Sequence, residues 1–387
     1  MQKGDAAYIK NMNKQLVLTC IKDHAPISRS EISKKVNISK PTVSLLVDQL
    51  LKENWITETG PGQSSLSGGR KPVNLIFNPK AAYVVGVDIG GTKVASGIVD
   101  LDGRVYASRE FPTQDFLNRS LFKRLHNDVA EMMKELNIRD QDILGMGIGV
   151  PGVTDVTQGL VIDAPALQWK YFSARENAEK YFNFPIYIEN DVNTSVLGEH
   201  WLGAGQQKDN LIYIAIGTGI GSGLIINGQL YRGSNYSAGE MGYLVTDREL
   251  ANHYHPVFEG YGFLESVASG SSIGNKLSKI KNRTITAKEA FELVKAGDPD
   301  ARKVVETAIE NLGLGIANYV SLFDPEIVIL GGGVSGAFSE FKNQLDDILE
   351  RFTPKKCKVV PSTFGKEAGV IGAVALFLKE YDSIFKI

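Results

Sequence analysis

Residues 83–93 read YVVGVDIGGTK and carry the most informative pattern in the larger part of the chain. Its apolar beginning predicts a buried strand that carries an aspartate to its end. The two glycines that follow permit a turn tight enough for backbone N–H groups to approach a phosphate. A threonine hydroxyl and a lysine charge complete the pattern. The residues expected beside the phosphates are Asp88, Gly90, Gly91, Thr92 and Lys93.

The same signal occurs twice more. An apolar run at 210–216 leads into GTGIGSG at 217–223, and another at 326–330 leads into GGGVS at 331–335. A single turn of this kind is usually no more than a tight turn, but three of them after buried strands are far more specific. The strands alternate with helical stretches, which predicts an α/β architecture. The further nucleotide-binding candidates are Gly217, Thr218, Gly219, Gly331, Gly332 and Gly333.

Residues 1–79 predict a separate module of three short helices. Ser28 and Glu31 form a capping-box pattern ahead of RSEISKKV, and Ser39 caps a third helix with Pro41 in its first turn. Three short helices with a capped third one are typical of a helix-turn-helix, whose recognition helix enters the major groove of DNA. The side chains predicted on the apolar faces are Ile9, Met12, Leu16, Val17, Cys20 and Ile21 in the first helix, and Leu45, Leu46, Leu50 and Leu51 in the third.

Two strand-like runs, 55–58 and 73–77, flank a Gly/Ser-rich loop and predict a hairpin, or wing. The basic GGRKP segment at 68–72 suits insertion of an arginine into a narrow minor groove. The alternative is a three-helix protein-interaction module followed by a flexible linker. The predicted DNA contacts are Ser39, Lys40, Thr42, Ser44, Gly69, Arg70 and Lys71.

Composition agrees with this division. Of the 387 residues, the first 79 hold 11 lysines and arginines against 6 acidic residues, and the rest hold 31 against 38. That asymmetry suits a module that meets a polyanion, with chance as the alternative. The two cysteines, Cys20 and Cys357, lie far apart and indicate no disulfide framework. Because the N-terminus is polar and no apolar run is long enough to span a bilayer, we expect a cytoplasmic protein with no membrane partner.

With these motifs together, the chain resembles the ROK family (repressors, open reading frames and kinases) nearly end to end. DIGGTK, GTGIGSG and LGGGVSG resemble the two phosphate loops and the adenosine segment, IENDVN the segment of the catalytic aspartate, and SAGEMGY the sugar-binding ExGH motif. The resemblance implies an N-terminal winged helix-turn-helix and a two-lobed actin-like ATPase (ribonuclease H-like) sugar kinase fold. The implied domains are 1–79 for DNA binding, 80–200 plus 366–387 for a small α/β lobe, and 201–365 for a large α/β lobe with sugar binding and dimerisation.

The resemblance also implies roles for single residues. Asp191 would face a sugar hydroxyl and accept its proton in a kinase. Asn190, Glu240 and Glu265 would hydrogen-bond ring hydroxyls. Asp88 would hold magnesium through water, and Lys93 would sit near the phosphates.

Two departures from the family pattern stand out. The family usually has a histidine where Tyr243 stands at the sugar edge, and a zinc-binding cysteine cluster shortly after it. Because the histidine and all three thiolates are missing together, we expect no structural zinc. His253, His255 and Glu259 lie in the gap, where an HxH metal site is the alternative to a polar surface loop.

Three functions are weighed on this basis. The first is a sugar-responsive repressor that binds operator double-stranded DNA as a homodimer or dimer of dimers and is released by a free monosaccharide. Residues 62–90 are most similar to the family's xylose-responsive repressors, so xylose is the first candidate and glucose the second. The second is an active ATP-dependent sugar kinase with an added DNA-binding module, for which ATP and Mg would be needed; repression itself requires no cofactor. The third is an assembly module without a ligand.

Overall fold

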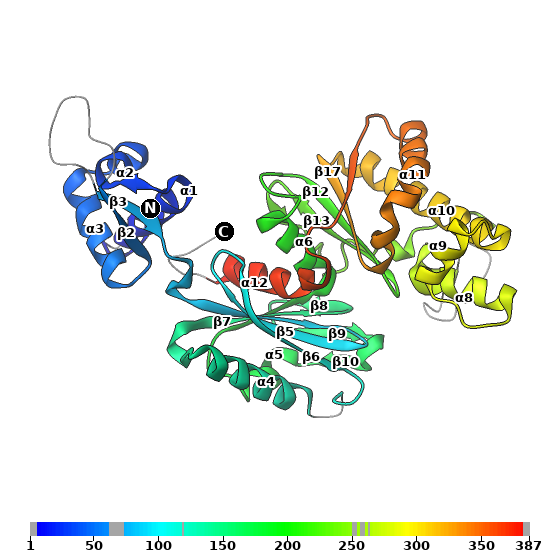
Figure 1. Ribbon diagram of the computed structural model, residues 1–387, viewed down its shortest axis with the longest axis horizontal. Coiled ribbons are helices and arrows are strands. Elements are labelled where there is room, and N and C mark those ends of the chain that lie inside the picture. Colours follow the sequence, from blue (N-terminus) through cyan, green and yellow to red (C-terminus); the bar gives the residue numbers. More distant parts are fainter. Residues whose placement is uncertain are drawn as a thin grey trace.

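A computed structural model describes residues 6–61, 73–117, 120–249, 254–255, 260–261 and 264–381. Figure 1 shows a small N-terminal module beside two α/β lobes. The module is a winged helix, with its three strands in the order β1-β3-β2. Its elements are α1 Ala6–His24, β1 Ile27–Ser28, α2 Arg29–Val36, α3 Lys40–Lys52, β2 Ile56–Pro61 and β3 Val73–Phe77.

The predicted caps of the module are confirmed. The Ser28 hydroxyl accepts from the Glu31 N–H, while the Glu31 carboxylate accepts from the Ser28 N–H at 2.9 Å. Asn37 takes the left-handed conformation that ends α2, and the Ser39 hydroxyl then accepts from the Thr42 N–H to begin α3. These local hydrogen bonds set the tight turn between α2 and α3 that defines a helix-turn-helix.

The apolar faces predicted for α1 and α3 are only partly buried. In α1 the core is reached from Val17 onward, and the earlier members Ile9, Met12 and Leu16 are about half exposed. In α3 the prediction that Leu45 is buried is wrong, because its side chain is 56% exposed. Leu51 is only half-buried. The buried face of α3 is Val43, Leu46, Val47 and Leu50, whose spacing follows one helical stripe.

The first lobe is built on a mixed five-stranded sheet in the order β11-β7-β4-β5-β6. β4 is antiparallel to β5 and parallel to β7. Helices α4 and α5 lie on one face of this sheet and α12 on the other (Figure 1). The elements are β4 Tyr83–Ile89, β5 Lys93–Asp100, β6 Val105–Pro112, α4 Leu121–Leu136, β7 Ile143–Val150, α5 Ala174–Glu179 and β11 Ile186–Asn190, with a small sheet of β8 Val153–Asp155, β9 Leu160–Ala164 and β10 Trp169–Phe172.

The second lobe repeats this topology. Its sheet has the order β14-β13-β12-β17-β18, and the first strand again pairs antiparallel on one side and parallel on the other. Two sheets of the same strand order and direction are the sign of a duplicated actin-like fold. The elements are β12 Leu211–Ile216, β13 Ile220–Ile226, β14 Gln229–Leu230, β15 Tyr254–His255, β16 Gly260–Tyr261, α7 Glu265–Ala268, α8 Gly270–Lys281, α9 Ala287–Lys295, α10 Pro299–Phe323, β17 Ile327–Gly331, α11 Phe338–Phe352 and β18 Lys358–Pro361.

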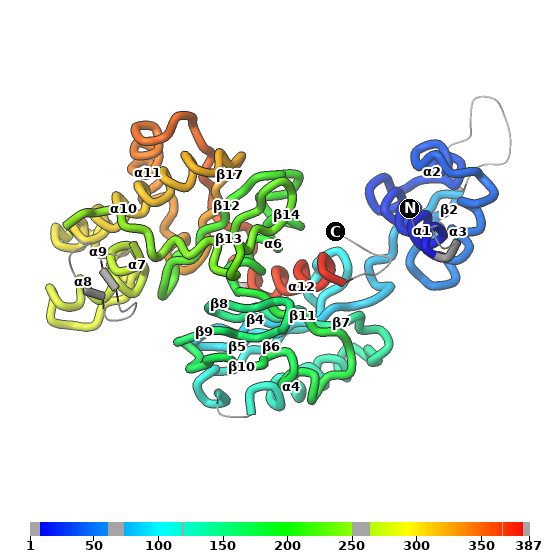
Figure 2. Tube along the Cα trace, turned by 180° about the vertical axis from the view of Figure 1, so that it is seen from behind, coloured from blue at the N-terminus to red at the C-terminus, as the bar shows by residue number. Residues whose placement is uncertain are grey.

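Two helices, α6 Asp191–Leu202 and α12 Ala368–Glu380, lie between the two sheets (Figure 2). One face of the second sheet packs on them through a buried cluster. The backbones of the two helices lie close together where Gly198 of α6 meets Gly372 of α12. A Cβ added to Gly198 would lie 3.1 Å from the Cα of Gly372. A Cβ on Gly147 of β7 would lie 1.8 Å from the carbonyl oxygen of Ala373 in α12. Glycines therefore allow the central helices to lie directly on the first sheet.

The described residues include no helix that is both long and apolar enough to cross a membrane.

We predict that Gly147→Ala destabilises the protein by about 1–3 kcal/mol, because the new methyl group displaces α12 from the sheet. The control is Gly336→Ala, since a Cβ there meets nothing within 4 Å. Urea unfolding of both variants measures the difference. Equal unfolding midpoints would show that α12 does not rest on the glycine surface of β7.

Candidate functional site

Four carboxylates from separate elements form a row, which we call the carboxylate row: Asp88, Asp191, Glu240 and Glu265. Asp88 lies near the end of β4 and Asp191 begins α6, whereas Glu240 follows β14 and Glu265 begins α7. Each member interacts electrostatically with the next, from Asp88 to Asp191, then to Glu240, then to Glu265. The structure therefore brings together residues that span 177 positions of sequence, from both lobes.

The carboxylate row is electrostatically unfavourable in its charged form. Burial raises the pKa of Asp88 to about 7, with a further increase from Asp191 that Lys93 partly opposes. Burial also raises the pKa of Asp191 to about 6, although the Val192 N–H favours its charged form. Glu240 keeps access to solvent, yet burial and then Asp191 raise its pKa too. Such groups gain most from a ligand that offers hydroxyl donors or a cation.

Asp191 is held firmly at the start of α6. Its Oδ1 accepts from its neighbour Val192 N–H at 2.9 Å. Its carbonyl oxygen accepts from the hydroxyls of Thr194 at 2.8 Å and Ser195 at 2.9 Å. The second carboxylate oxygen has no hydrogen bond among those described, so the geometry suits an acceptor for a ligand hydroxyl.

Asn190 serves mainly as the cap of α6. Its Oδ1 accepts from the N–H groups of Val192 at 2.9 Å and Asn193 at 3.0 Å. Its Nδ2 donates to the carbonyl oxygen of Gly152 at 3.0 Å. A ligand would therefore meet only the remaining N–H of this amide, and the sugar contact expected of Asn190 stays a prediction.

Glu265 and Tyr243 lie at the other end of the carboxylate row. Glu265 Oε2 accepts from the Ile220 N–H at 2.9 Å, and Gly219 leaves the space for it, since a Cβ there would come within 2.6 Å of that oxygen. Tyr243 is 48% exposed, and its pKa is raised by burial and by Glu240, Glu265 and Asp163. Because Asp163 belongs to β9 of the first lobe, its effect on the pKa of Tyr243 acts across the two lobes.

The first glycine turn joins β4 and β5. The Gly90 N–H donates to the Lys93 carbonyl at 2.9 Å, and the Gly90 carbonyl accepts from the Thr113 hydroxyl at 2.7 Å. The Lys93 ammonium donates to Glu110 at 2.5 Å, and both side chains are about half exposed. A phosphate at this turn would have to draw Lys93 away from Glu110. The sequence analysis did not predict this ion pair.

The other two glycine turns lie at one edge of the second sheet. They follow the adjacent parallel strands β12 and β17, in which Ala215 pairs with Gly331. The Gly217 N–H donates to the Gly219 carbonyl at 2.9 Å, and the Thr218 carbonyl accepts from the Ser271 hydroxyl. Gly332 has a φ of 80°, which favours glycine. The turn at 331–333 thus lies beside the turn at 217–219. The nucleotide contacts expected of Gly331, Gly332 and Gly333 stay a prediction.

The structure adds an ion bridge between the lobes that the sequence did not predict. Glu189 is 2% exposed, and its Oε2 accepts from Arg232 Nε at 2.6 Å. Arg232 Nη2 also donates to Glu380, at the end of α12, at 2.6 Å. The other oxygen of Glu189 accepts from the Asn190 N–H at 2.9 Å and from Asn193 Nδ2 at 3.1 Å. Arg232 therefore ties the loop that leads to Glu240 to the strand that leads to Asp191.

The predicted DNA contacts are only partly described. Ser39 and Lys40 are exposed at the start of α3, and Thr42 and Ser44 are half-buried. The Ser39 and Thr42 hydroxyls also hydrogen-bond each other at 2.8 Å. Arg29, at the start of α2, forms an exposed ion pair with Asp48 of α3 at 2.8 Å. Gly69, Arg70 and Lys71 lie outside the described residues.

No three His, Cys, Asp or Glu side chains among the described residues form a group that could hold a metal ion. His253 and Glu259 lie outside those residues, so the absence of structural zinc stays a prediction that elemental analysis can test.

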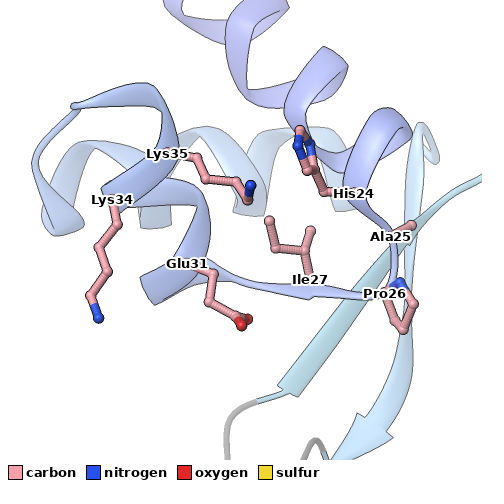
Figure 3. A pocket seen from close by; sticks show the side chains of 7 residues that line it. All are labelled: His24, Ala25, Pro26, Ile27, Glu31, Lys34 and Lys35. Atoms are coloured by element: carbon pink, nitrogen blue, oxygen red, sulfur yellow. The ribbon is translucent and has the colours of Figure 1, made fainter.

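Two surface hollows lie away from the carboxylate row. One, of about 420 Å³, lies between the end of α1 and α2, and Figure 3 shows Lys34, Lys35 and Glu31 around it. The other, of about 360 Å³, lies beside α4. Neither includes a residue predicted to bind a ligand or DNA.

Comparisons with known proteins agree with both parts of the chain. Residues 84–380 match the ROK family and residues 10–59 match the MarR family. A xylose repressor from Caldicellulosiruptor bescii is 31% identical over 97% of this chain and 98% of its own length. A glucokinase from Halalkalibacterium halodurans is 30% identical over 79% of this chain and 97% of its own. The crystal structure of a ROK family transcriptional regulator, a homologue of the E. coli MLC protein, shares the fold with a TM-score of 0.80, at 24% identity over 95% of this chain and 96% of that one.

We predict that Arg232→Met destabilises the protein by about 3–5 kcal/mol, because it leaves Glu189 buried without its counter-charge. The control is Arg139→Met, whose side chain is 70% exposed beside Asp142 and should contribute less than about 1 kcal/mol. Chemical denaturation measures both, and Arg232→Met combined with Glu189→Gln should recover part of the loss. Equal effects of the two arginine substitutions would contradict a structural role for the bridge.

We predict a pH-dependent effect of Asp88→Asn. The folded state raises the pKa of Asp88 from 3.8 to about 7. The contribution of Asp88 to the free energy of unfolding of the wild type therefore falls as the pH rises through that interval. Lys93, Asp191 and Glu110 face the group and set the size of the effect. The difference in free energy of unfolding, variant minus wild type, should therefore shift in favour of the variant by about 1–3 kcal/mol from pH 5 to pH 8. Urea unfolding at both pH values, with the exposed Asp140→Asn as control, tests this; a constant difference would refute it.

Proposed function

Because this chain belongs to the ROK family, we propose that it is a sugar-responsive transcriptional repressor. The winged module binds operator DNA, and the carboxylate row binds a free monosaccharide that releases it. The observation that carries the proposal is the combination of a capped recognition helix, exposed at its start, with a row of carboxylates whose pKa values are raised by burial and mutual repulsion. The match of residues 10–59 to the MarR family supports the DNA-binding part.

DNA recognition follows from the position of Lys40, Thr42 and Ser44 at the start of α3. The first turn of a recognition helix meets base edges in the major groove, and a two-fold dimer reads half-sites about 34 Å apart or at multiples of that spacing. We propose a homodimer or a dimer of dimers. A small rotation of one module then changes the spacing of the two recognition helices and weakens binding.

Sugar recognition follows from the acceptors of the carboxylate row. A monosaccharide offers several hydroxyl donors, and Asp191, Glu240 and Glu265 offer carboxylate oxygens, with the remaining N–H of Asn190 and the Tyr243 hydroxyl at the edge. Xylose is the first candidate because a similar full-length relative is a xylose repressor, and glucose the second because another relative is a glucokinase.

A sugar kinase is the second candidate function. The three glycine turns favour it, and so does Asp191, whose pKa of about 6 suits a general base near neutral pH. In that case ATP would meet the glycine turns, and Asp88 would hold magnesium through water. The ion pair between Lys93 and Glu110 works against it, because the cation expected at the phosphates is already neutralised.

Asp191→Asn and Glu240→Gln should give proteins that bind operator DNA normally but no longer respond to sugar. Each substitution removes a carboxylate acceptor, and an unpaired polar partner in the site costs about 1–3 kcal/mol. DNA-binding titrations with D-xylose and then D-glucose measure the response. Glu292→Gln, on the exposed surface of α9, is the control and should behave as wild type.

The same variants separate the two functions. A normal sugar response by Asp191→Asn would show that the carboxylate row is not the sensor. Turnover of sugar and ATP by wild type at about 1–100 per second, abolished in Asp191→Asn, would establish the kinase instead.

A further inference from the structure

The DNA-binding module and the first lobe share one hydrophobic core. Val17 and Ile21 of α1 and Phe77 of β3 belong to the same buried cluster as Leu101, at the end of β5, and Phe377 of α12. Figure 2 shows the module beside the end of α12. The module therefore contacts the lobe through buried apolar side chains as well as through its linker.

The linker itself is fixed at both ends. Asn78 donates its N–H to the Trp55 carbonyl at 2.9 Å and its Nδ2 to the Asn54 carbonyl at 2.8 Å, which binds it to the module. The next residue, Pro79, accepts from the Leu101 N–H at 3.1 Å, which binds it to the lobe. Two successive linker residues, Asn78 and Pro79, therefore connect Leu101 to the module.

Leu101 belongs to a rigid turn, residues 100–104, which we call the bridging turn. The Asp100 side chain is 2% exposed, and its Oδ1 accepts from the N–H groups of Asp102 at 3.0 Å and Arg104 at 2.9 Å. Gly103 has a φ of 83° and donates its N–H to the Asp100 carbonyl. These internal hydrogen bonds hold the bridging turn together.

One side of the bridging turn contacts the helix that begins in the carboxylate row. A Cβ on Gly103 would lie 2.1 Å from Leu202 Cδ1 and 3.6 Å from Trp201 Cη2, so the glycine rests directly on the end of α6. The first residue of that helix is Asp191. An α-helix of this length is about 18 Å long and transmits a tilt at one end to the other.

The other side of the bridging turn contacts the DNA-binding module. Lys22 of α1 and Asp102 interact as opposite charges in partly buried surroundings. The Lys22 ammonium also lies 5.9 Å from the centre of the Phe77 ring. The turn thus interacts with the first helix of the module through the charge of Asp102, and it contacts the linker through the N–H of Leu101.

We propose that the bridging turn carries the state of the sugar site to the DNA-binding module, through the contact of Gly103 with Leu202 and the attraction between the opposite charges of Asp102 and Lys22. The inference rests on the proposed function and specifies its route. A ligand at Asp191 tilts α6, the end of α6 displaces the bridging turn, and the turn rotates the module through Pro79 and Lys22. Allosteric coupling of this kind requires that the contacts along the route differ between the sugar-free and the sugar-bound protein.

The test uses the full-length protein and a DNA duplex that wild type selects from a random library. Operator affinity is measured without and with D-xylose, and with D-glucose as the second probe, in wild type, Lys22→Met and Asp102→Asn. Sugar affinity is measured in parallel. The matched control is Lys10→Met, an exposed lysine of the same helix.

We expect sugar to weaken operator binding by at least about tenfold in wild type and Lys10→Met, as typical coupling energies imply. Lys22→Met and Asp102→Asn should reduce that effect to less than about threefold while changing sugar affinity and sugar-free operator affinity little. Exchanging the charges, with Lys22→Asp and Asp102→Lys together, should restore part of the coupling, which a merely structural loss would not.

Two outcomes overturn the inference in distinguishable ways. A full sugar response in Lys22→Met and Asp102→Asn alike would leave the proposed function standing and reject the bridging turn as its route. A wild type whose operator binding is unaffected by either sugar would reject the proposed function and this route together.

Discussion

The close backbone contact of α6 and α12 between the two sheets is the constraint on which the rest of the structure depends. Glycines in the strands and in both helices allow this contact, since added Cβ atoms would overlap the backbone opposite. Gly369 at the start of α12 leaves the space that the Asp88 carboxylate fills. Asp191 stands at the first turn of α6. The helices that join the lobes therefore also place two acidic residues of the carboxylate row.

Buried carboxylates of two kinds surround this contact. Glu199 is fully buried and accepts from the Ser362 and Thr363 hydroxyls and from the Thr363 and Ala204 N–H groups, and Glu189 has Arg232. These satisfied groups stabilise the structure. Asp88 and Asp191 instead face each other, with raised pKa values. Burial makes the charged forms of Asp88 and Asp191 costly, so a ligand that supplies hydroxyl donors is favoured beside them. Glu189 and Glu199 already have their hydrogen-bond partners and gain less from such a ligand.

Local patterns in the sequence were sufficient for much of the fold. The glycine turns, the strands before them and the caps at Ser28 and Ser39 are encoded within a few residues, and the structure confirms these elements. Asp88 could be singled out because it lies near the end of such a strand, and Asp191 because IENDVN resembles the family segment that carries the catalytic aspartate. The exposure of Leu45 was missed because an apolar leucine next to a buried stripe is indistinguishable from a member of it until the packing is known.

Contacts between distant residues could not be predicted in this way. Arg232 and Glu189 are 43 positions apart, and Lys93 and Glu110 are 17 apart on paired strands. The bridging turn looks like an ordinary surface turn in the sequence, and only the packing shows that Gly103 rests on Leu202. Such contacts depend on how the lobes and the module meet, which spacing along the chain does not encode.

The most direct test of the account is calorimetric titration of the protein with sugar, in the absence and in the presence of saturating operator DNA. Thermodynamic linkage requires that DNA lower the sugar affinity by the same factor by which sugar lowers the DNA affinity. The account predicts equal factors of about tenfold or more. Sugar binding of the same affinity with and without operator DNA would contradict it.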